Sequence, residues 1–138
     1  MAGMIIVHRK DVKTWKFPKE EGGLTSFRAL TGAVTGSKNL YMGAASMPPG
    51  KAHSWHVHPR PVEEVFYVLQ GEGRQEWEED GKIKCTTIRK GDFCYTPSDC
   101  PHQVTCVSSE PLELLCALYP VYVGKERPPV VERLIKKR

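Results

Sequence analysis

The stretch HSWHVHPRPVEEVFYVLQGEG, residues 53–73, holds three histidines within six residues, then two glutamates and an apolar run that reaches a glycine. If its first residues form a strand, alternation places His56 and His58 on one face and His53 on the other. Two imidazoles at i and i+2 then lie close together. Inside a barrel such a pair is costly unless it is hydrogen-bonded or binds something, and a metal ion is the usual reason to gather it.

An isolated His-x-His of this kind is more often the polar face of an edge strand, but the surroundings of this one favour a metal. Glu64 precedes the apolar run VFYVLQG, and a carboxylate among apolar neighbours needs a cation or several donors. A second segment, GDFCYTPSDCPHQVTC at 91–106, reads as a short strand, a proline-containing turn and a strand that opens at His102. Three histidines and one carboxylate form a mixed N/O set suited to Fe, Mn, Ni, Co, Cu or Zn.

The rest of the chain predicts an all-β fold. Short apolar or alternating runs recur between turn residues, and Asp80-Gly81 between two alternating segments is a strong hairpin signal. Many short strands with no long helix between them indicate an antiparallel sandwich or barrel. The C-terminal PPVVERLIKKR, 128–138, predicts one short helix. The strand-like runs are 4–7, 24–34, 40–47, 63–70, 73–79, 82–88, 92–97, 102–107 and 112–123.

Composition bounds the class of protein. With 138 residues, 40% hydrophobic and 26% charged, the chain is expected to form one globular domain, 1–138. No apolar run approaches the roughly 20 residues that span a bilayer, and the N-terminus does not read as a signal peptide, so a cytoplasmic protein without a membrane partner is expected. Five cysteines, without a C-x-x-C pair, predict free thiols. The net charge of +4 comes without a basic patch interleaved with aromatics, so no nucleic-acid partner is expected.

The first segment resembles the first motif of the cupins, which are small jelly-roll barrels also called double-stranded β-helices. That motif is similar to G-x5-H-x-H-x(3–4)-E-x6-G, and it reads here as Gly50, His56, His58, Glu64 and Gly71. The gap before Glu64 is five residues. Choosing Glu63 as the ligand would restore the usual gap, but it would put Gln70 in the place of the closing glycine.

The second segment resembles the second cupin motif, G-x5-P-x-G-x2-H-x3-N. It reads as Gly91, Pro97 and His102, with Asp99 in the place of the glycine and Cys106 in the place of the asparagine. The resemblance covers about residues 40–119 and implies a cupin jelly-roll barrel.

The resemblance also implies a site. Its metal ligands would be His56, His58, Glu64 and His102, with one divalent transition metal per chain. Glu64 could double as a proton carrier if it leaves the metal. The surface or an interface is expected for His53. The candidates for the pocket lining are Phe66, Val68, Tyr95, Val104 and Cys106. For Phe66, Val68 and Cys106 a place in the core is preferred over contact with a substrate, and Tyr41 and Trp77 could border the pocket mouth.

Three functions are open at this point. The first is a metal-dependent enzyme acting on a small oxygen-rich molecule, by dioxygenase or oxidative decarboxylase chemistry. The second is a non-redox lyase, or a sugar isomerase or epimerase. The third is a small-molecule-binding module without turnover, which the complete ligand set disfavours.

A homodimer is also expected. Strand 63–70 carries apolar residues on both faces, with Val65, Tyr67 and Leu69 opposite Phe66 and Val68. A sheet that is apolar on both sides needs a second cover, which another copy of the chain would supply.

Overall fold

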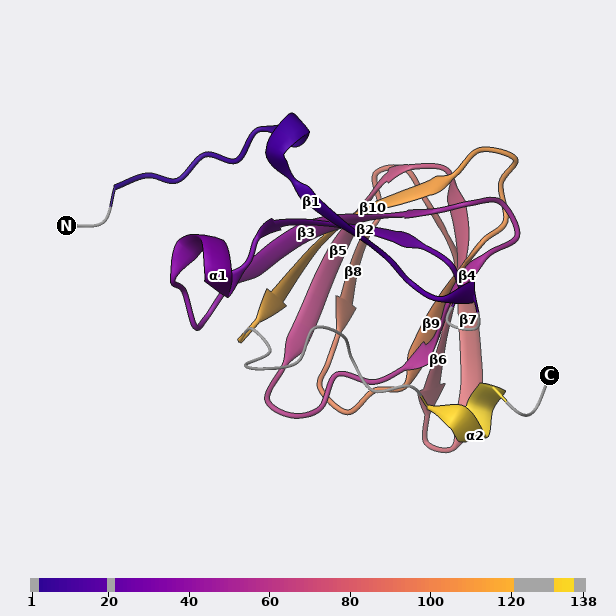
Figure 1. The fold of residues 1–138 in the computed structure, drawn as a ribbon. Helices are drawn as coiled ribbons and strands as arrows, with labels where there is room; N and C mark the ends of the chain where they lie inside the picture. The colour runs from indigo at the N-terminus through magenta and orange to yellow at the C-terminus, as the bar shows by residue number, and fades with distance from the viewer. Residues whose placement is uncertain (1–2, 20–21, 121–130, 136–138) are drawn as a thin grey trace.

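The computed structural model describes residues 3–19, 22–120 and 131–135, which fold as two antiparallel sheets packed face to face (Figure 1). The larger sheet has the strand order β1-β2-β3-β10-β5-β8, and the smaller has the order β4-β9-β6-β7. This arrangement confirms the expected all-β jelly roll. The strands are β1 (Lys13–Lys16), β2 (Thr25–Leu30), β3 (Tyr41–Met47), β4 (Ala52–His56), β5 (Glu63–Gln70), β6 (Glu72–Glu79), β7 (Lys82–Arg89), β8 (Phe93–Thr96), β9 (His102–Cys106) and β10 (Leu112–Tyr119).

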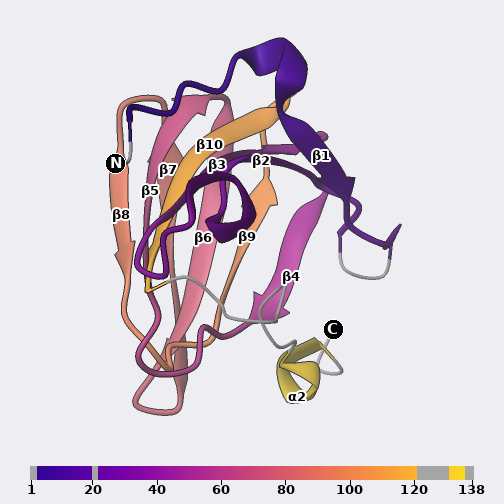
Figure 2. The same ribbon diagram turned by 60° about the vertical axis from the view of Figure 1, so that its left-hand side comes forward.

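The helices are short. They are the 3-10 helix η1 (Arg9–Asp11), α1 (Gly32–Thr35) and α2 (Glu132–Ile135). The expected C-terminal helix is therefore present, although residues 128–130 and 136–138 of the predicted segment lie outside the described residues. It lies beside β4 (Figure 2), where Leu134 is buried and the Val131 amide donates to the Trp55 carbonyl over 2.8 Å. No helix in the described ranges has the length and apolar character needed to cross a bilayer.

The β6–β7 hairpin forms where the sequence predicts it. Asp80 and Gly81 both adopt positive φ, 51° and 71°, as the tight turn between two paired strands requires. Elsewhere two expectations were wrong. Residues 4–7 form no strand, and Met4 and Ile6 are exposed. The run 24–34 ends as a strand at Leu30 and continues into α1, and the last residues of the run 112–123 lie outside the described part of the chain.

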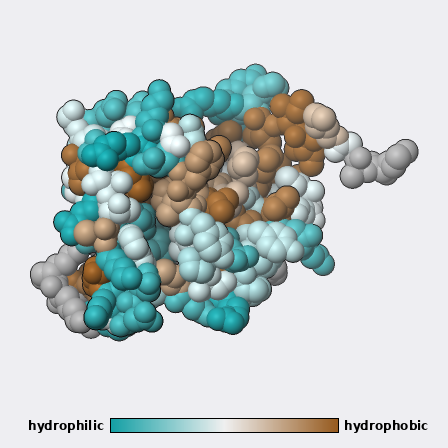
Figure 3. Space-filling model, turned by 180° about the vertical axis from the view of Figure 1, so that it is seen from behind, coloured by the Kyte–Doolittle hydropathy of each residue, from teal (hydrophilic) through white to brown (hydrophobic). Residues whose placement is uncertain are grey.

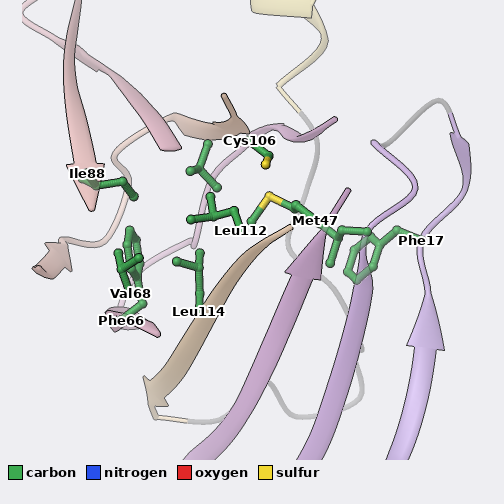
Figure 4. Close-up of a cluster of buried hydrophobic side chains, with 10 residues drawn as sticks. Phe17, Met47, Phe66, Val68, Ile88, Cys106, Leu112 and Leu114 are labelled. Carbon is green, nitrogen blue, oxygen red and sulfur yellow. The ribbon is translucent and has the colours of Figure 1, made fainter. Parts of the chain in front are cut away.

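The space between the sheets is apolar along most of its length (Figure 4). On β9, the inward positions run from His102 through Val104 to Cys106, and on β5 from Glu64 through Phe66 and onward. Each strand thus places a polar residue at one end and core residues at the other. The core cluster comprises Phe17, Leu24, Met47, Phe66, Val68, Ile88, Val104, Cys106, Leu112 and Leu114.

Candidate metal centre

Three histidines from β4, the segment that follows it and the neighbouring strand β9 meet at the polar end of the barrel. His56 ends β4, His58 follows it by two residues, and His102 opens β9, where it pairs with His56. All three side chains are buried, with 2–3% of their surface exposed. One ring nitrogen from each lies within 4.8 Å of the others. The structure therefore brings together the three imidazoles that the sequence singled out.

Backbone carbonyls orient two of these rings. The Nδ1 atom of His56 lies 2.7 Å from the Ser54 carbonyl oxygen, and the Nδ1 atom of His102 lies 2.8 Å from that of Cys100. Because a carbonyl only accepts, Nδ1 carries the proton in each ring and the Nε2 lone pair is left to bind. The His102 Nε2 atom is buried and has no hydrogen-bond partner among the described residues. A buried nitrogen acceptor without a donor, beside other imidazoles, fits a metal ion.

Glu64 supplies the negative charge beside these rings. Its carboxylate oxygens lie 3.5 Å from Nε2 of His58 and 3.8 Å from Nε2 of His102. Burial alone would raise the pKa of this carboxyl, but its proximity to the two histidines outweighs burial and holds the pKa below its usual range. The neighbouring Glu63 is exposed and accepts a hydrogen bond from the Tyr95 hydroxyl. Glu64, not Glu63, faces the histidines.

His53 does not lie where strand parity predicts. Its ring stacks on His56, with centroids 3.9 Å apart, and meets Phe17 edge-on at 5.1 Å. The cause is a β-bulge: His53 pairs with Val104 and His56 with His102, so three steps along β4 match two along β9. The expected opposite face was therefore wrong. Burial lowers the pKa of His53 to about 3, so this ring is neutral at pH 7.

A cavity of about 410 Å³ lies beside His102, between the β6–β7 hairpin and β8. Tyr95 and Trp77, both named from the sequence, line it, and Tyr41 is not among its described lining residues. The other four predicted pocket residues, Phe66, Val68, Val104 and Cys106, belong to the hydrophobic core, because they lie further along their strands than the histidines.

Sequence reasoning missed one polar lining residue. Gln75 lies on β6, is 4% exposed and lines the cavity. It pairs with Val104 while Trp77 pairs with His102, so both β6 side chains point into the barrel. Alternation along 73–79 would have placed the two on one face. It could not have shown that this face is the interior wall.

Comparison with protein families matches residues 43–118 to the cupin domain. Among curated proteins, the chain is 32% identical over 90 residues to an uncharacterized protein of Methanocaldococcus jannaschii, a match that covers 61% of this chain and 68% of that protein. It is 33% identical over 112 residues to polyketide synthase CurC of Streptomyces cyaneus, covering 80% and 68%. It is 32% identical over 72 residues to the oxalate-binding protein of Thermotoga maritima, covering 52% and 55%.

Solved structures share the fold. A predicted oxalate decarboxylase from Thermotoga maritima superposes with a TM-score of 0.71 at 22% identity, covering 85% of this chain and all of the other. Oxalate decarboxylase from Bacillus subtilis superposes with a TM-score of 0.76 at 20% identity, covering 97% of this chain but 34% of that larger protein. At these identities the likeness concerns the architecture alone.

Proposed function

The chain belongs to the cupin family, and from this premise we propose that it is an enzyme that uses one divalent transition metal to act on a small oxygen-rich molecule. The reaction class that we favour is dioxygenation or oxidative decarboxylation. The observation that carries the proposal is the cluster of three buried imidazoles with one carboxylate beside them. A barrel core gathers such groups at a cost unless they bind a cation.

The metal would be held by His56, His58, His102 and Glu64. When bound, a divalent ion with these ligands supplies a Lewis acid that polarises a substrate oxygen, or a redox centre if the ion is iron, copper or manganese. The carbonyls of residues 54 and 100 fix the tautomers of two of the rings, which prepares their Nε2 atoms as ligands.

The protein supplies three further elements of the proposed reaction. Glu64 keeps its charge at neutral pH, so that it can accept a hydrogen bond from a substrate hydroxyl at a carboxylate oxygen. The core residues behind the histidines exclude water from one side of the site, since Phe66 and Val68 are 5% and 0% exposed. The cavity beside His102 gives a substrate room next to the site.

A second candidate is a binding module without turnover. It is favoured by the 32% identity to a protein named for binding oxalate, over about half of each chain. A binding module would hold the molecule unchanged and does not require a metal, whereas the enzyme would change the molecule at the metal.

The experiment that tests the proposal is elemental analysis of the chain purified without an affinity metal column, beside the double variant His56→Ala/His102→Ala. About one metal ion per chain, lost in the variant, is the expected result. Iron or manganese would lead to oxygen-consumption assays with diketones, catechols and small acids. Absence of metal in the wild type, even after reconstitution, would overturn the proposal and leave the binding module.

A further inference from the structure

The cavity beside His102 has walls that suit an aromatic molecule better than a small dianion. Its described lining residues include Trp77, Ile88 and Cys94 but no lysine or arginine. Both carboxylates that line it are already paired with cations. Glu79 lies 2.8 Å from Lys84, and Glu78 lies 2.6 Å from Arg133. Since the two nearby cations are already paired and the described lining holds no lysine or arginine, a dianion would gain no favourable charge from the cavity wall.

The volume leads to the same conclusion. About 410 Å³ lies within the range of roughly 300–1,000 Å³ for pockets that enclose drug-sized ligands. A molecule with one or two rings can fill much of this space. An anion of six heavy atoms such as oxalate would leave most of the apolar wall without van der Waals contacts.

Trp77 is held in place beside the site. Its backbone pairs with His102, so its side chain shares the interior face of the sheet with that imidazole. Its indole N–H donates to Glu79 over 3.0 Å, and Glu79 is itself paired with Lys84. A ring that is fixed at its polar end offers a preorganised surface for stacking.

Gln75 supplies the hydrogen-bonding group of the cavity. Its side-chain N–H donates to the Glu76 carbonyl over 3.3 Å, while its Oε1 atom is buried without a hydrogen-bond partner among the described residues. The side chain is 4% exposed and lines the cavity. A buried carbonyl oxygen without a donor in the protein is a group that a ligand O–H can satisfy.

We propose that this cavity binds a neutral aromatic molecule that carries hydroxyl groups, of the catechol or enolised diketone class. One hydroxyl donates to Oε1 of Gln75, the ring packs against Trp77, and the neighbouring oxygen points toward His102 and its partners. This inference rests on the proposed function for the metal, and it adds Gln75 as the residue that selects for a hydroxyl donor.

The test is calorimetric titration of the full chain with three probes: catechol, 1,2-dimethoxybenzene, which lacks the O–H donors, and oxalate. It is made on the metal-free chain and on the chain incubated with Zn²⁺, which does no redox chemistry. In the metal-free chain, catechol is expected to bind at least about tenfold more tightly than oxalate, and in both forms more tightly than the dimethyl ether. Oxalate binding to the metal-free chain as tightly as catechol would overturn the inference.

Substitutions at Gln75 and Trp77 test which side chains bind the ligand. Gln75→Leu keeps the volume and removes the acceptor, so the affinity for catechol should fall about tenfold while that for the dimethyl ether stays within about twofold. Gln75→Met repeats the test with a second apolar replacement. Trp77→Leu should weaken both aromatic probes. The matched control is Gln103→Leu, because Gln103 is also a buried amide but pairs with Glu76, outside the cavity.

An equal effect of Gln75→Leu and Gln103→Leu would contradict the assigned role of Gln75. The metal content of the same samples separates this inference from the proposed function. Catechol binding that depends on Gln75 in a chain that takes up no metal would support the cavity and refute the enzyme. Metal uptake without catechol binding would support the metal site and refute the proposed ligand of the cavity.

Discussion

His53 stacks on His56 with ring centroids 3.9 Å apart, although the residues stand three positions apart on one strand. The β-bulge between them turns His53 to the same side as His56. His53 therefore packs behind a ring whose other neighbour is His102, with centroids 4.1 Å apart. This stacking restricts how the His56 ring can rotate, in addition to the hydrogen bond at its Nδ1 atom.

We expect His53→Ala to weaken metal binding about tenfold, as the loss of a group that orients a ligand commonly does. His53→Phe should restore most of the affinity, since the stacking ring is kept. Competition with a chromophoric chelator measures both affinities. An alanine variant with wild-type affinity would show that the stacking does not position His56.

A second prediction separates the two adjacent glutamates. Glu64→Gln removes the charge beside His58 and His102, so the affinity for a divalent metal should fall by at least about tenfold, or roughly 1.4 kcal/mol. Glu63→Gln is the matched control, because Glu63 is exposed and bonded to Tyr95, and its metal affinity should not change. The same chelator competition measures both. The opposite order would place Glu63 at the metal.

Strand alternation predicted most of the fold and the inward direction of Glu64 and His102, whereas β4 ends at His56, so that His58 lies beyond the expected strand. The runs 63–70, 82–88 and 102–107 agree with β5, β7 and β9 to within a residue or two. In β5 the burial alternates along the strand, because Phe66 and Val68 face the core. The bulge at His53 could not be predicted from alternation, since an extra residue in one strand shows only in how that strand pairs with its neighbour. The missed role of Gln75 has a similar cause, because it depends on where β6 lies relative to β8.

The stability of the metal-free chain should depend on pH. Burial lowers the pKa of His53 to about 3 and that of His56 well below its usual value, whereas both titrate near 6.5 in the unfolded chain. Below pH 6.5 the unfolded state therefore binds more protons. The free energy of unfolding is then greatest above this pH and falls as the pH decreases, by up to about 1.4 kcal/mol per pH unit for each ring.

Urea denaturation of the metal-free chain at pH 7.5, 6 and 5 measures this slope. His53→Gln should reduce the slope, and His8→Gln, in the exposed N-terminal segment, should leave it as it is. A stability that is constant over this range would contradict the burial of the two rings in neutral form.

The closing glycine of the first motif is expected to be structurally required. Gly71 has φ +79°, and a Cβ there would lie 2.6 Å from the Pro111 carbonyl oxygen. Gly81 in the hairpin turn has φ +71° with open space around it. Gly71→Ala should therefore cost about 3 kcal/mol, from backbone strain plus overpacking, and Gly81→Ala only about 1 kcal/mol. Chemical denaturation compares them, and equal costs would mean that the close approach to Pro111 is relieved without penalty.

The outer face of the larger sheet is the surface on which we expect a second copy of the chain. One row of side chains crosses four strands, with Met42, Ala117, Val65 and Tyr95 paired in register. Met42, Val65 and Tyr95 are 41%, 49% and 58% exposed. Seen from behind, hydrophobic side chains form a band across part of the molecule, between hydrophilic regions (Figure 3). A continuous apolar face can cover an identical face across a two-fold axis, which removes both from water.

Val65→Lys should weaken this dimer at least about tenfold, because it buries two charges in the interface. Ile83→Lys is the matched control, since Ile83 is equally exposed, at 50%, but lies on β7 of the smaller sheet. Sedimentation over a range of concentrations measures the association, and metal content confirms that the variants fold. A wild-type chain that stays monomeric at every concentration would rule out the dimer. A dimer that Ile83→Lys disrupts and Val65→Lys does not would place the interface on the smaller sheet instead.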